Sequence, residues 1–79
     1  MILSEAKNGE ILIVENFSGC KCMVSRLAAL GIYKGSKIEV IDNSSQGQML
    51  VAVLDSRLAL GKGIANKIAV KKSHLENDE

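Results

Sequence analysis

Apolar residues form short runs along this chain, and five of these runs have the length and spacing of β-strands. The run at residues 10–15 is rich in β-branched side chains and bounded by glutamates, which is typical of a buried strand. The run at residues 37–42 alternates apolar with polar positions, so one of its faces is expected to be buried. Further runs lie at residues 49–54, 58–60 and 68–71. A polar loop at 43–48 predicts that the second and third runs pair as a hairpin.

One segment has the periodicity of a helix instead. Met23, Leu27 and Leu30 fall on one face of a helix predicted over residues 21–30. Gly31 follows directly, and glycine there can adopt the left-handed conformation that ends a helix. Gly35 stands third in the turn at residues 33–36, where a type II turn requires a positive φ. We expect the apolar face of this helix to cover one open end of the strands.

These elements predict a single small domain that is mainly β. The chain has 79 residues, of which 47% are hydrophobic but only 3% aromatic, so its core must be aliphatic. Five short strands with tight turns, and one helix inserted between the first and second strands, favour a closed or partly closed barrel. We place the barrel domain at residues 1–72. Residues 73–79 are expected to form a flexible polar tail.

The overall charge does not indicate a strongly basic or strongly acidic protein. The formal net charge is +1, with 24% charged residues. Nucleic-acid binding is disfavoured because no aromatic side chain interleaves the cations to stack on bases. No apolar run approaches the roughly 20 residues that a membrane-spanning helix needs, and no secretory signal pattern opens the sequence. We therefore expect a cytoplasmic protein without direct membrane insertion.

The charge is nevertheless unevenly distributed. Between Asp55 and Glu76 the chain carries cations and no acid: Arg57, Lys62, Lys67, Lys71 and Lys72. A solvated face explains this most simply, and a docking surface for an acidic partner is the sharper hypothesis. Arg26, on the flank of the predicted helix, either complements the helix dipole or reaches a carboxylate or phosphate of a partner.

Two cysteines provide the one candidate metal site. Cys20 and Cys22 could bind Fe(II) or Zn(II) through two thiolates. A tetrahedral site needs about four ligands, however, and the single histidine, His74, lies in the predicted tail. Two chains in a weak homo-oligomer could each donate a pair. The simpler interpretation is two ordinary reduced thiols, with no cofactor required.

Catalysis is not predicted. The sequence places no serine or cysteine beside an evident base, and it shows no pair of inward carboxylates for acid–base work. We therefore expect a protein that is not an enzyme.

Three parts of the sequence resemble the FeoA-type ferrous iron transport proteins. They are Leu3-Ser4-Glu5-Ala6 with Gly9, Arg26-Leu27-Ala28-Ala29-Leu30-Gly31-Ile32 with Gly35, and Leu58-Ala59-Leu60-Gly61-Lys62-Gly63-Ile64-Ala65 with Ile68-Ala69-Val70. The resemblance covers residues 1 to about 72 and implies an SH3-like barrel. The chain departs from the family's usual pattern at Lys34, where many relatives have proline, and at the Cys20-x-Cys22 pair.

The same resemblance implies a function. It indicates a small cytosolic accessory protein that docks on the cytosolic domain of an Fe(II)-transporting membrane GTPase, to regulate or assemble it. Two alternatives stay open. One is a protein that binds or delivers transition-metal ions through Cys20 and Cys22. The other is a generic SH3-like peptide-binding module, although the aromatic-lined groove that recognises proline-rich ligands is missing.

Overall fold

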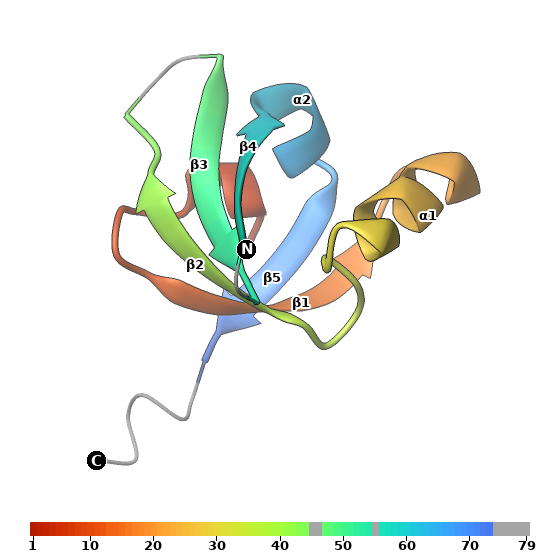
Figure 1. Cartoon of the computed structure of the whole chain (residues 1–79), viewed down its shortest axis with the longest axis horizontal. Helices are drawn as coiled ribbons and strands as arrows, with labels where there is room; N and C mark the ends of the chain where they lie inside the picture. The colour runs from red at the N-terminus through yellow and green to blue at the C-terminus, as the bar shows by residue number, and fades with distance from the viewer. Residues whose placement is uncertain (45–46, 55, 74–79) are drawn as a thin grey trace.

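The computed structural model describes residues 1–44, 47–54 and 56–73. They contain one five-stranded sheet in the order β4-β3-β2-β1-β5, and all neighbouring strands are antiparallel. Figure 1 shows the sheet curling around the core, with helix α1 beside it. The strands are β1 (Ile11–Phe17), β2 (Lys37–Asp42), β3 (Gln48–Val53), β4 (Ser56–Gly61) and β5 (Ile68–Lys72). The predicted mainly β fold, with α1 (Lys21–Ala29) between the first two strands, is confirmed.

The core is aliphatic, as the composition required. Alternate residues of each strand face inward, so that Ile38 and Val40 of β2 are buried while Lys37 and Glu39 are exposed. The largest fully buried side chains come from all parts of the chain: Leu3, Leu12, Val14, Ile32, Ile38, Val40, Met49, Val51, Val53, Ile68 and Val70. Burial of this apolar surface is the main favourable contribution to folding.

Several strand ends differ from the prediction. β1 continues to Phe17, because a register shift between Val14 and Asn16 lets its last residues pair with β5. β4 begins at Ser56, two residues before the predicted run at 58–60, and it pairs with β3 along its whole length. β3 ends at Val53, since Leu54 adopts a positive φ of 54° in the tight connection to β4.

Helix α1 ends at the position that Gly31 predicted. Leu30 caps α1, Gly31 has a φ of 98°, and the N–H of Ile32 donates to the carbonyl of Leu27 at 2.8 Å. Such a bond from beyond the glycine back into the last turn is typical of a Schellman ending.

The expected packing of α1 is only partly correct. Leu27 is buried and Met23 is half-buried, but Leu30 remains 48% exposed. Figure 1 shows that one end of α1 reaches away from the sheet. Leu27 and, in part, Met23 therefore contact the core, and α1 flanks the barrel instead of closing one of its ends.

Two shorter helices complete the barrel. α2 (Lys62–Ala65) joins β4 to β5. η1 (Leu3–Glu5) is a 3-10 turn in the N-terminal segment, and the hydroxyl of Ser4 donates to the side-chain oxygen of Asn66, next to α2. None of the helices in the described parts of the chain is long and apolar enough to cross a membrane.

The two edges of the sheet differ. Along β5, the carbonyl of Met1 accepts a hydrogen bond from the N–H of Val70 at 2.8 Å, and Ile2 forms a β-bridge with Ala69. The N-terminal residues thus cover part of this edge. No strand among the described residues pairs with the outer side of β4, which ends the sheet opposite β5.

The predicted tail is only partly described. Ser73, its first residue, is buried, and its N–H donates to the carbonyl of Ile11 at 3.1 Å. The remainder of the predicted tail, residues 74–79 with His74, lies outside the described residues.

Candidate functional site

An apolar groove lies between α1, β4 and α2, with a volume of about 290 Å³. Among the described residues, Arg26 is the one charged side chain that lines it, and no acid does. Two of its apolar side chains are unusually open to solvent, since Leu30 is 48% and Ile64 39% exposed. The full lining is Met23, Arg26, Leu27, Leu30, Ala59, Leu60, Gly61 and Ile64. The groove can therefore accept an apolar side chain next to a negatively charged group.

Two further cations come from segments that adjoin this groove. Lys62 directly follows the lining residue Gly61. Lys67 lies at the N-terminal side of α1, because its carbonyl accepts a hydrogen bond from the N–H of Ser18 at 2.8 Å. The groove cations are thus Arg26, Lys62 and Lys67, and we keep this name for them.

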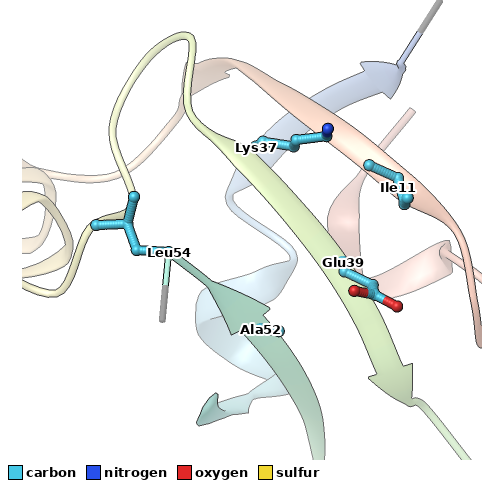
Figure 2. A pocket seen from close by; sticks show the side chains of 5 residues that line it. All are labelled: Ile11, Lys37, Glu39, Ala52 and Leu54. Carbon is cyan, nitrogen blue, oxygen red and sulfur yellow. The ribbon is translucent and has the colours of Figure 1, made fainter. Parts of the chain in front are cut away.

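A second groove, of about 310 Å³, crosses the outer face of the sheet. Figure 2 shows its five lining side chains: Ile11, Lys37, Glu39, Ala52 and Leu54. The first three strands supply four of these residues, with Ile11 opposite Glu39 and Glu39 opposite Ala52, and Leu54 directly follows β3. The groove carries one positive and one negative side chain, so it offers an acidic partner less attraction than the groove beside α1.

The other predicted cations are spread over the sheet. Arg57 lies on β4 opposite Ala52, and Lys71 lies on β5 opposite Ile13, with three strands between these two edges. Lys72 is 3.8 Å from the carboxylate of Glu10 in a solvent-exposed ion pair, which is expected to contribute little to stability. The acid-free stretch of sequence therefore supplies cations to both edges of the sheet and to α2.

The cysteine pair is joined as a disulfide in this structure, whereas two reduced thiols were favoured from the sequence. Cys20 and Cys22 form a disulfide with their Cα atoms 5.4 Å apart, a separation within the usual range of about 4.4–6.8 Å. Cys20 is the extended N-cap residue of α1 and Cys22 lies in its first turn. This backbone bend brings the two side chains together, and both residues are exposed.

A metal site at these sulfur atoms would first require reduction of the disulfide, because the thiolate is the form that binds metals. The described part of the chain contains no group of three or more His, Cys, Asp and Glu side chains that could hold a metal ion. Cys20 and Cys22 alone thus remain an incomplete ligand set in this structure.

A polar residue directly after β2, Asn43, holds the N-terminal segment in place. The side-chain amide of Asn43 donates to the carbonyls of Ser4 and Ala6, at 3.0 and 2.7 Å. Hydrogen bonds from the hydroxyl and the N–H of Ser44 lower the pKa of Asp42 below its ordinary value. Asp42 is therefore ionised at neutral pH.

The sequence indicated Arg26 but not the groove beside it. Ala59 was expected to be an ordinary strand residue. Ile64 and Ala65 are adjacent in the single turn of α2, and of these two only Ala65 is buried. The approach of α1 to β4 itself depends on contacts between segments that are distant in the sequence.

Comparison with known proteins shows which family the sequence matches. A family model described as "FeoA domain" matches residues 1–72. A Methanocaldococcus jannaschii protein named "Putative Fe(2+) transport protein A" is 41% identical over 70 residues, which cover 87% of this chain and 83% of the relative.

Solved structures agree with this match. A crystal structure of an iron uptake regulatory protein (FeoA) superimposes with a TM-score of 0.86 at 32% identity, covering 92% of this chain and 97% of the other. The solution structure of the FeoA protein from Chlorobium tepidum gives a TM-score of 0.82 at 27% identity, with 91% and 70% covered. The SH3-like barrel expected from the sequence is the fold of these neighbours.

Proposed function

Because the chain belongs to the FeoA domain family, we propose that it is an accessory protein of ferrous iron transport that binds the cytosolic domain of an Fe(II)-transporting membrane GTPase. The observation that carries this proposal is the 41% identity to an Fe(2+) transport protein over 83% of that relative's length. The proposed role is binding and not catalysis. The described residues include no histidine, the side chain most often used as a general acid or base.

The groove between α1 and β4 is the proposed contact surface. It combines half-exposed apolar side chains with the groove cations Arg26, Lys62 and Lys67, so it suits a partner segment that is apolar and acidic. Arg57, Lys71 and Lys72 add to the positive field around it at longer range. Complementary charge of this kind raises association rates and selects partners more than it raises affinity.

The proposal predicts salt-dependent binding. We would label the protein, titrate it with the GTPase's purified cytosolic domain, and measure affinity and association rate at 0.1 and 1 M salt. Association should slow at high salt, because the Debye length falls from about 10 Å to about 3 Å. Reversing two groove cations, Lys62→Glu with Lys67→Glu, should slow association at low salt. The free energy of unfolding should change little, by about 0–1 kcal/mol, because exposed charges contribute little to folding.

A matched control separates position from net charge. Lys34→Glu with Lys37→Glu changes the net charge equally but at a turn and on the outer face of β2, away from the groove. Equal slowing in both double variants would refute the role of the groove cations. Failure of the GTPase domain to bind the unmodified protein would refute the proposed function itself.

A further inference from the structure

The backbone of β4 has hydrogen-bonding groups that the sheet does not use. The N–H of Lys62 donates to the carbonyl of Gly47 at 3.1 Å, so these residues form a hydrogen-bonded pair of the antiparallel ladder between β3 and β4. Such pairs recur at every second residue. Leu58 and Leu60 therefore direct their backbone groups toward β3. The residues between them, Arg57 and Ala59, direct their N–H and C=O groups to the outer edge.

This edge is open, unlike that of β5. Within the described ranges, no residue hydrogen-bonds to the outward groups of Arg57 and Ala59 or to the outward N–H of Gly61. Both Arg57 and Ala59 are exposed to solvent. Ala59 and Gly61 also line the groove beside α1. A row of free donors and acceptors thus runs along the wall of an apolar, positively charged groove.

We propose that the outer edge of β4 binds an extended, acidic segment of a partner protein, which adds to the sheet as a further strand. This inference rests on the proposed function and specifies how the GTPase's cytosolic domain would be recognised. The segment's backbone would pair with Arg57 and Ala59, as in other complexes formed by strand addition. An apolar side chain would enter the groove between Leu30 and Ile64. A neighbouring carboxylate would pair with Arg26.

Each part of the surface selects against another kind of ligand. A helical ligand leaves the β4 groups unpaired, since its own N–H and C=O groups are bonded internally. A basic segment would be repelled by Arg26, Arg57 and Lys62. A proline-rich segment lacks backbone donors and is usually bound by aromatic-lined grooves, whereas this groove is lined by aliphatic residues.

Hydrogen exchange of the unmodified protein tests the proposal directly. We would record amide exchange with and without the GTPase's cytosolic domain. The outward amides of Arg57, Ala59 and Gly61 should slow, by up to about 100-fold when free partner is about 100 times Kd. The amides of Leu58 and Leu60 already bond to β3, so they are protected before the partner binds. They provide a reference on the same strand against which new protection of the outward amides is judged.

One substitution isolates the backbone bond. Ala59→Pro removes an outward N–H but no bond to β3, and edge strands tolerate proline at such positions. Affinity for the GTPase domain should fall by about fivefold to tenfold, the effect of one lost hydrogen bond. Ala59→Ser keeps the N–H and should lose much less affinity than Ala59→Pro. If Ala59→Pro fails to fold, the exchange experiment on the unmodified protein still tests whether a strand adds to β4.

The outcomes separate this inference from the function on which it rests. Binding that slows exchange only at the outer-face groove, around Ile11 and Ala52, would overturn strand addition and leave the proposed function intact. Absence of binding would overturn both. Exchange at Arg57 and Ala59 that slows with rising concentration of this protein alone would assign the edge to a second copy of the chain instead.

Discussion

At the scale of single residues, Asn43 links the N-terminal segment to the barrel. Its side-chain amide satisfies the carbonyls of Ser4 and Ala6, and its backbone N–H donates to the side chain of Asn8 at 2.6 Å. The segment that it holds contains the fully buried Leu3 and continues back to Met1, which covers β5. One polar side chain thus supports both part of the core and one edge of the sheet.

Asn43→Asp should destabilise the protein by about 1–3 kcal/mol, because two part-buried carbonyls lose their donor and face a carboxylate. Urea unfolding at neutral pH would measure the difference. Asn66→Asp is the matched control, since Asn66 uses its side-chain oxygen to accept a hydrogen bond from Ser4 and a carboxylate can still accept it. Equal losses in the two variants would contradict a special role for Asn43.

At the scale of elements, α1 is attached to the barrel mainly through one side chain. Leu27 is 3% exposed, whereas Leu30, one turn later on the predicted apolar face, is largely open to solvent. Leu27→Ala should therefore cost about 2–5 kcal/mol in the free energy of unfolding. Leu30→Ala should change it by no more than about 0.5 kcal/mol. Urea titration of both variants would show similar losses if the two side chains were equally buried.

The elements that the sequence predicted well are those determined by local patterns. Alternation placed Ile38 and Val40 in the core, and Gly31 marked the end of α1. The strand ends were less predictable, because the bulge in β1 and the turn at Leu54 depend on partner strands.

The candidate site was predictable only in part, for the same reason. Arg26 could be chosen from its position on a helix. The open edge of β4 follows from the order of all five strands, and that order depends on pairings such as that of β1 with β5, which local patterns do not reveal.

At the scale of the whole molecule, folding should not depend on a metal ion. The aliphatic core is continuous, and the described residues provide no metal cluster. Circular dichroism should stay unchanged with a chelator, both before and after the disulfide is reduced. A Cys20→Ser, Cys22→Ser variant should behave in the same way. Collapse of the reduced parent on chelation, but not of the double variant, would establish a structural metal at the cysteine pair.

The difference between the two sheet edges also limits how this protein can polymerise. A fibre of barrels joined strand to strand needs two open sheet edges per molecule, because each molecule must pair with one neighbour at each edge. Here Met1 and Ile2 cover part of the β5 edge, so growth by strand pairing would be confined to β4. Two molecules that met there would form a two-fold symmetric pair, and the pair would have no free β4 edge left. Fibre formation by native barrels would therefore first require the N-terminal segment to detach.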